Sequence, residues 1–286
     1  MQKTLIARQH MPEIHHSDHF RTIGARSGPA LDLDPFLNID LFHMSQPTFA
    51  PHPHAGFSAV TYMLPESPGA FRNRDSAGDR SVIGPGALQW AQAGAGMVHE
   101  EAPDVAGEDC WGFQIFVNMA AADKQLPPRA FRVDSPDIPE LTAAGSTVRV
   151  LAGAQGGLRS QLTGLSISVE LYDINLDPDA TVTLTFDEGQ SIWGFGIGGA
   201  GHIGDLGGEP AVIDDHHIAL FSQDGTSLSL RAGERGLRAL VGGGPPLRQP
   251  VVWGGPFSMT SEEEVRAAYA RYERGEMGKL AAEPRP

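Results

Sequence analysis

Short apolar runs separated by turn residues recur along almost the whole chain, and this rhythm constrains the fold more than any other feature. The first half contains FSAVTYML, ALQWAQ and WGFQIFVNM, and the second half continues with LSISVELYDINL, TVTLTF and LRALVGG. Gly, Pro and Asp stand between the runs, in a chain with 35 glycines and 22 prolines. Runs of this length with such punctuation predict β-strands joined by tight turns. We therefore expect an all-β protein.

The chain is long enough for two domains, because its 286 residues exceed the roughly 100 to 200 residues of a single domain. Residues 134–145, DSPDIPELTAAG, are rich in proline and acid and show no periodic apolar face. They are the best candidate for a linker. We predict a first domain over 1–133 and a second over 146–286, with the strand pattern of the first repeated in the second but no clear sequence repeat.

One helix is predicted near the C-terminal end, over about 261–274. Thr260 and Ser261 precede two glutamates in a capping-box pattern, and Gly275 is a plausible stop. Apolar and aromatic residues then fall on one face at helical spacing; they are Val265, Ala268, Tyr269 and Tyr272. A structural role explains this face best, so we expect the helix to dock on the β-domains.

Composition and charge exclude several classes of function. The formal net charge of −14 would repel a phosphate backbone, which argues against direct nucleic-acid binding but leaves protein partners open. No apolar run approaches the roughly 18 residues that span a bilayer, and the start, MQKTLIARQH, lacks the pattern of a signal peptide. We expect a cytoplasmic protein. A single cysteine, Cys110, excludes an internal disulfide framework and a zinc site built on several thiolates.

The chemistry concentrates in two pairs of residues at i, i+2 spacing. PHPHAGFSAVTYML supplies His52 and His54, and AGAGMVHEE supplies His99 and Glu101. Side chains alternate faces along a strand, so each pair points to one side. Two such pairs facing one interior would surround a single metal ion. Three imidazoles and a carboxylate suit Fe(II), Ni(II), Co(II), Cu(II), Mn(II) or Zn(II) and leave positions open for other ligands.

The other histidines and the aromatic residues near the two pairs are weaker candidates for a functional role. One His-x-His pair arises easily by chance in a chain with 11 histidines, but two same-face pairs in separate predicted strands do not. Four histidines near the start are expected to be structural or solvated, because their spacing presents no consistent strand face; they are His10, His15, His16 and His19. His43 is a candidate for a role in the pocket or in supporting a metal ligand. In the second half, His202, His216 and His217 lack a His-x-His partner and a matching His-x-Glu, so no metal is expected there. Aromatic and sulfur side chains near the ligands could line a flat apolar pocket, although core packing is the favoured interpretation. These are Phe57, Tyr62, Trp90 and Met97.

Six stretches of sequence, including both pairs of residues, resemble the pirin family of the cupin superfamily. They are DPFLNIDLF at 34–42, HPHAGFSAVTY at 52–62, RDSAG at 74–78, IGPGALQWAQAGAGMVHEE at 83–101, FQIFVN at 113–118 and PLRQPVVWGGPFSMTSEEEV at 246–265. The resemblance covers nearly the whole length. It implies a bicupin, with two antiparallel β-barrels of jelly-roll type, and one divalent metal in the N-terminal barrel. The implied ligands are His52, His54, His99 and Glu101, while the second barrel is expected to bind no metal.

The resemblance also implies two classes of function. Bacterial members look like quercetin 2,3-dioxygenases, which insert both atoms of dioxygen into a flavonol and release carbon monoxide. On this hypothesis Fe(II) is the first candidate metal, and Glu101 either binds it or accepts the proton of the flavonol 3-hydroxyl. The partners would be a small aromatic or enolic substrate and O2, and we expect a monomer. The alternative is a non-catalytic, metal-dependent regulator that binds a transcription factor or a metabolic enzyme.

Overall fold

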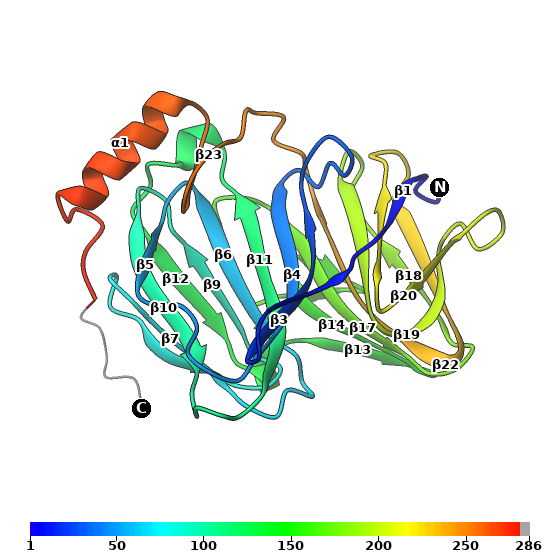
Figure 1. Cartoon of the computed structure of the whole chain (residues 1–286). Coiled ribbons are helices and arrows are strands. Elements are labelled where there is room, and N and C mark those ends of the chain that lie inside the picture. Colours follow the sequence, from blue (N-terminus) through cyan, green and yellow to red (C-terminus); the bar gives the residue numbers. More distant parts are fainter. Residues whose placement is uncertain (281–286) are drawn as a thin grey trace.

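The computed structural model describes residues 1–280 and builds most of them into antiparallel β-strands (Figure 1). Two β-rich halves lie side by side, and helix α1, Glu262–Glu273, lies against the first. The predicted all-β architecture with one C-terminal helix is confirmed, although the sheets do not close into complete barrels. Within the described residues, no helix is long and apolar enough to cross a membrane.

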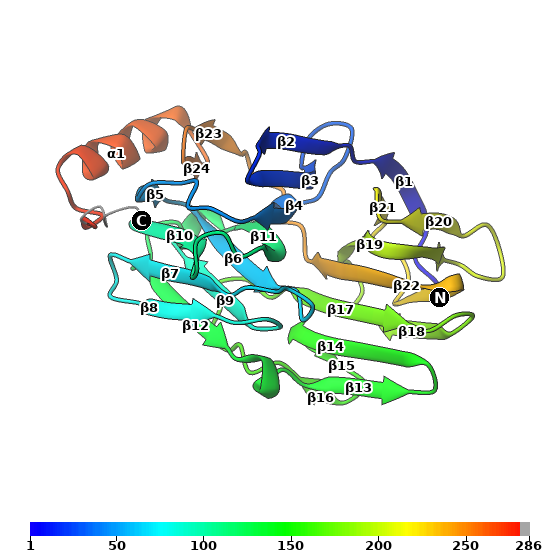
Figure 2. The same ribbon diagram turned by 60° about the horizontal axis from the view of Figure 1, so that its bottom comes forward.

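The first half is a sandwich of a seven-stranded and a four-stranded sheet (Figure 2). The larger sheet has the order β12 (Arg129–Val133), β9 (Leu88–Gln92), β6 (Phe57–Met63), β11 (Cys110–Asn118), β4 (Phe36–Met44), β3 (Phe20–Arg26), β2 (Glu13–Ser17). The smaller sheet has the order β5 (His52–His54), β10 (Met97–Pro103), β7 (Phe71–Asp75), β8 (Arg80–Ile83).

The two faces of the seven-stranded sheet have different chemistry, because successive side chains alternate. One face carries large apolar residues such as Val60, Tyr62 and Ile115, all fully buried. The other face carries residues such as Phe42, Asp40 and Gln114, which line a cavity between the two sheets. One sheet therefore serves a hydrophobic core on one side and a cavity on the other.

The second half is one strongly bent nine-stranded sheet. Its main path runs β1 (Leu5–His10), β21 (His217–Phe221), β19 (Ser191–Gly204), β22 (Ser227–Gly244), β17 (Glu170–Leu176), β14 (Ser146–Ala152), β13 (Glu140–Ala143), with β18 (Thr181–Thr185) on β22 and β20 (Ala211–Asp214) on β19. The long strands β19 and β22 shift register near Gly199, whose φ is +72°. A Cβ there would lie 2.3 Å from the carbonyl oxygen of Gly236, so the bend requires glycine.

A continuous hydrophobic core joins the halves. Phe113 of β11 packs edge-on against Phe195 of β19, and Phe36 of β4 packs in the same way against Trp193, with ring centroids 5.2 and 5.3 Å apart. Beside this core the Tyr62 hydroxyl donates to Asp173, which also pairs with Arg238 of β22. The two halves are therefore packed against each other through a shared hydrophobic core.

The chain ends cross between the halves. Strand β1 falls within the predicted first domain but pairs with β21 of the second sheet, while the hairpin of β23 (Val252–Gly254) and β24 (Phe257–Met259) packs with α1 on the first half. The predicted linker 134–145 contains a 3-10 turn, Ser135–Asp137, and strand β13, which pairs with β14. Polar, proline-rich composition did not reveal this edge strand. The domain bounds stay a prediction, and residues 281–286 of the second domain lie outside the described residues.

Short elements complete the described chain. A ribbon of β15 (Ala154–Gln155) and β16 (Leu158–Arg159) follows β14, and a 3-10 turn, Ala121–Asp123, follows β11. Helix α1 begins after Ser261, whose hydroxyl accepts the Glu264 backbone N–H at 3.2 Å. The Glu264 carboxylate in turn accepts the Thr260 N–H at 2.8 Å, which confirms the predicted cap. Val265 and Ala268 are buried against the first half, as predicted.

Candidate metal centre

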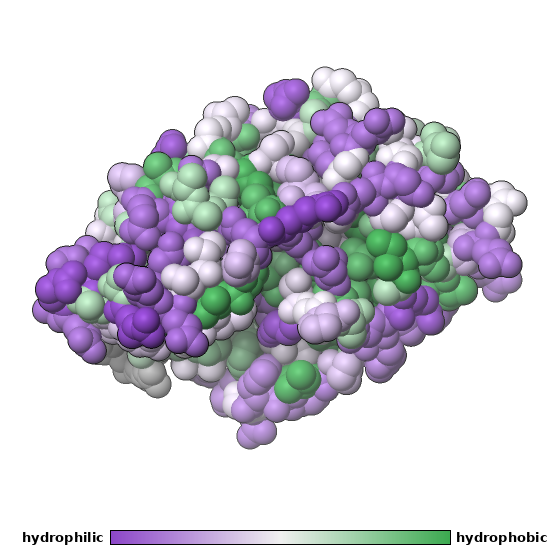
Figure 3. Space-filling model, turned by 90° about the horizontal axis from the view of Figure 1, so that it is seen from above, coloured by the Kyte–Doolittle hydropathy of each residue, from purple (hydrophilic) through white to green (hydrophobic). Residues whose placement is uncertain are grey.

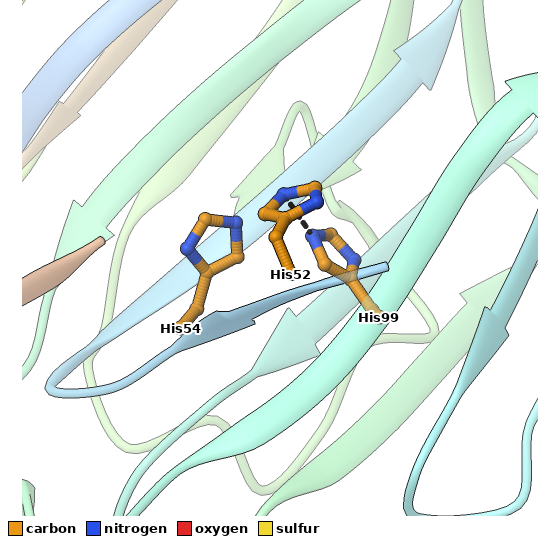
Figure 4. A group of neighbouring side chains, drawn as sticks. All are labelled: His52, His54 and His99. Carbon is orange, nitrogen blue, oxygen red and sulfur yellow. Dashed lines mark hydrogen bonds between the residues drawn. The ribbon is translucent and has the colours of Figure 1, made fainter. Parts of the chain in front are cut away.

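Three histidines converge inside the first half because β5 and β10 pair in antiparallel register. His52 lies directly opposite His99, and His54 lies two residues further along β5 on the same face. All three rings project into the space between the sheets and toward one another (Figure 4). One ring nitrogen from each lies within 4.8 Å of the others. The i, i+2 spacing and the strand pairing together therefore create one compact cluster.

Hydrogen bonds orient two of these imidazoles. His52 Nδ1 donates to the Ala50 carbonyl at 2.9 Å, and His54 Nδ1 faces the Pro256 carbonyl at 3.4 Å. When Nδ1 carries the proton, the lone pair sits on Nε2. The Nε2 atoms of His52 and His99 are 3.2 Å apart. The carbonyls thus direct ring nitrogens toward a common point, as metal-binding histidines require.

The electrostatics favour a cation at this point. Burial lowers the pKa of all three imidazoles, that of His54 to about 3, and the neighbouring rings lower the pKa of His54 and His99 further. The rings are therefore neutral at pH 7, so each can direct a nitrogen lone pair toward a cation between them. Among the described residues, none forms a hydrogen bond with the buried His99 Nδ1. Converging lone pairs in a buried site fit a divalent transition metal, with three neutral nitrogen ligands.

Glu101 follows His99 by two residues on β10 and lines the same cavity, but its carboxylate lies outside the histidine group. Its Oε1 accepts a hydrogen bond from Thr61 Oγ1 at 2.5 Å. Burial raises the pKa of Glu101 to about 7, although the Thr61 hydrogen bond opposes this shift. Its roles as fourth ligand and as base remain predictions.

The cavity measures about 680 Å³ and is walled by aromatic rings different from those suggested by sequence. Phe57, Tyr62, Trp90 and Met97 are all packed in hydrophobic clusters, as the favoured interpretation held. Tyr62 and Trp90 belong to the hydrophobic core that joins the two halves. The aromatic wall consists of Phe20, Phe42, Phe49, Phe71, Phe116 and Trp253.

The remaining histidines lie outside the metal cluster. His16 lines the cavity and contacts the Thr22 hydroxyl at 2.9 Å, a position that sequence reasoning did not anticipate. His43 contacts Arg21 and the Trp111 ring instead and does not line the cavity. His217 pairs with Asp214 at 2.6 Å in the second half. Among the described residues, the group formed by β5 and β10 is the metal-binding candidate.

A family model described as Pirin matches residues 14–117, and one described as the Pirin C-terminal cupin domain matches residues 171–278. The chain belongs to the pirin family. Pirin sequence thus accounts for both halves, each of which is a cupin domain, and the molecule is a bicupin as predicted.

Curated pirin relatives align over most of this chain. A pirin-like protein from Solanum lycopersicum is 35% identical, covering 86% of this chain and 83% of its own length. A putative quercetin 2,3-dioxygenase from Pseudomonas aeruginosa is 35% identical, covering 89% of this chain and 90% of its own. Human pirin is 32% identical, covering 86% of this chain and 84% of its own.

Solved structures share the architecture. A quercetin 2,3-dioxygenase from Acinetobacter baumannii superposes with a TM-score of 0.85 at 27% identity, covering 98% of this chain and 100% of that chain. A bacterial pirin from Escherichia coli, solved with nickel(II), has a TM-score of 0.63 at 18% identity, covering 82% of this chain and 96% of that chain. At this identity the second likeness concerns the fold alone.

Proposed function

We propose that this pirin is a metal-dependent dioxygenase that cleaves a flavonol such as quercetin with O2. The observation that carries the proposal is the position of the His52, His54 and His99 cluster inside a cavity of about 680 Å³. This volume lies within the roughly 300 to 1,000 Å³ of small-molecule sites. The Acinetobacter baumannii relative, described as a quercetin 2,3-dioxygenase, and the Pseudomonas aeruginosa relative, described as a putative one, support the same reaction class.

The cavity walls suit a flat aromatic substrate. Phe116 packs near His54, with ring centroids 5.5 Å apart, and Trp253 and Phe49 line the cavity while remaining 47% and 44% exposed. Exposed rings bordering a cavity give a substrate an apolar surface on its way to the interior. Seen from above in Figure 3, hydrophobic patches interrupt a largely hydrophilic face of the molecule.

The chain supplies ligands and a proton acceptor. A divalent metal held by the three histidines would supply Lewis-acid and redox chemistry toward a flavonol and dioxygen. Glu101 would accept the proton of the flavonol 3-hydroxyl, since its carboxylate lines the same cavity. Thr61 holds that carboxylate through its hydroxyl and fixes the direction of its oxygens. Overall, both atoms of O2 enter the product and one ring carbon leaves as carbon monoxide.

The test is oxygen uptake by the purified protein, stripped of metal and reloaded with Fe(II), Ni(II), Co(II), Mn(II) or Cu(II) in turn, with quercetin supplied. We propose Fe(II) as the first candidate and a monomer as the active state, which light scattering would check. Metal-dependent uptake with carbon monoxide release is expected, and Glu101→Gln should abolish it. A pirin that binds one metal per chain yet consumes no oxygen with any of them would instead support the regulatory alternative, in which a transcription factor or metabolic enzyme is the partner.

A further inference from the structure

A row of polar side chains crosses the cavity face of the seven-stranded sheet. In the register, Thr61 of β6 lies opposite Gln114 of β11, and Gln114 lies opposite Asp40 of β4. The Thr61 hydroxyl contacts both Glu101 and Gln114 Oε1, the latter at 3.3 Å. Gln114 and Asp40 line the cavity. The row therefore begins beside the metal centre and ends at Asp40, two strand spacings or about 10 Å away.

Asp40 is a buried carboxylate held from two sides. Its Oδ1 accepts Arg26 Nη1 at 2.5 Å, and its Oδ2 accepts Asn38 Nδ2 at 3.0 Å. Asp40 is only 9% exposed, and all three residues line the cavity. A carboxylate has about four acceptor positions, so two partners leave it able to accept further hydrogen bonds.

The next strand leaves room for this carboxylate. Gly24 of β3 lies opposite Asp40, and a Cβ at Gly24 would lie 1.9 Å from Asp40 Oδ1. Any side chain at position 24 would displace the carboxylate from Arg26. Aromatic rings such as Phe42 and Phe116 flank the row. The cavity thus combines a histidine cluster from β5 and β10, aromatic walls and a separate polar group on β4.

We propose that Asp40 is a specificity-determining residue whose carboxylate accepts a hydrogen bond from a phenolic hydroxyl on the part of the substrate remote from the metal. This inference rests on the proposed function and narrows its substrate class to flat polyphenols with hydroxyls at both ends. A substrate with a carboxylate at this position would be repelled by the negative charge of Asp40. A substrate with a methyl ether there would have no hydrogen to donate to Asp40. Hydrogen bonds to charged groups are among the strong ones, so the remote hydroxyl should dominate discrimination.

Binding measured without turnover tests the inference directly. Two flavonols share the 3-hydroxy-4-keto edge: quercetin carries hydroxyls on its outer rings, and 3-hydroxyflavone carries none. Calorimetric titration of the Zn(II)-loaded protein under nitrogen should give a Kd for quercetin at least roughly tenfold lower than for 3-hydroxyflavone. Asp40→Asn should remove most of that difference and leave the Kd of 3-hydroxyflavone unchanged. Asp187→Asn, at an exposed position in the second half, is the matched control and should change neither value.

The outcomes separate this inference from the proposed reaction. Equal weakening of both ligands by Asp40→Asn, or no weakening of either, would overturn the role of Asp40. If that variant fails to fold, the wild-type protein still decides the point, because indifference to outer-ring hydroxyls and to their methylation contradicts the inference. Oxygen uptake with no difference between the two flavonols would support the dioxygenase reaction and refute the role of Asp40 in specificity. A difference in Kd that depends on Asp40, with no oxygen uptake, would support that role and refute the dioxygenase reaction.

Discussion

The two cupin domains are built from the same kind of antiparallel sheet, yet the first encloses a cavity lined by polar and aromatic residues and the second a buried apolar cluster. In the first, residues facing inward include His54, Glu101, Gln114 and Asp40, and about 680 Å³ remains open. In the second, the inward positions belong to a buried apolar cluster that includes Ile174, Ile203, Ile213, Phe221 and Leu230. Along each strand every second side chain points into the domain, and the two domains differ in the residues at these inward positions. The same architecture thus gives a site or a core according to which side chains point in.

The strongest test of this contrast is removal of one imidazole from each domain. His99→Ala should abolish stoichiometric metal binding, because losing a direct ligand exceeds the roughly 10- to 100-fold loss seen when only a supporting hydrogen bond is removed. His202→Ala is the control, since His202 lies in the second domain outside the histidine group. Elemental analysis after dialysis against each metal gives the occupancy. A fall in metal content for His202→Ala would contradict the prediction that the second domain binds none.

A matched pair of phenylalanines extends the comparison to stability. Phe221 is fully buried in the second core, whereas Phe49 lines the cavity and is 44% exposed. Phe221→Ala should lower the free energy of unfolding by about 3–5 kcal/mol, and Phe49→Ala by about 0.5 kcal/mol or less. Urea titrations give both values, provided that the dependence of the unfolding free energy on urea concentration is the same for each variant. Equal losses would mean that the cavity wall contributes to stability as a core does, and would weaken the contrast.

The histidine cluster could be predicted from the sequence, because its geometry depends on local spacing. The His-x-His spacing fixes side-chain direction on any strand, so the convergence of His52, His54 and His99 required only that β5 and β10 pair. Tyr62 shows the limit, because nearness in sequence to a ligand does not decide which face a side chain takes. Its hydroxyl reaches Asp173 in the other domain.

Contacts between residues far apart in the sequence could not be predicted, because they depend on how the strands pair. Asp40 and Gln114 meet only through the register of β4 and β11, and Trp253 reaches the cavity from the C-terminal segment. Strand β1 leaves its own half to pair with β21. Such contacts depend on tertiary packing, which composition and periodicity do not encode at a single position.

The N-terminal segment packs on the second domain and the C-terminal hairpin on the first, and a buried lysine anchors each of them. Lys3 Nζ donates to carbonyls of the second domain, the shortest to Gln190 at 2.9 Å. Lys124 Nζ donates to the Gly56 carbonyl at 2.6 Å and, in the C-terminal hairpin, to the Ser258 carbonyl at 2.9 Å. Burial lowers the pKa of both lysines, that of Lys124 to about 8. Each ammonium therefore fastens one end of the chain to the opposite domain at the cost of burying its charge.

This burial gives a pH-dependent prediction for Lys124. Between pH 8 and its ordinary pKa of 10.5, the unfolded chain binds a proton that the folded chain lacks, so the unfolding free energy rises with pH. Relative to Lys124→Met, the wild type should therefore gain on the order of 2 kcal/mol across that window, with the difference constant below about pH 7. Urea titrations of both proteins from pH 7 to 10.5 measure it. A difference that stays flat to pH 10.5 would mean that Lys124 keeps its proton in the folded protein. Its hydrogen bonds to Gly56, Asn118 and Ser258 would then outweigh the burial of its charge.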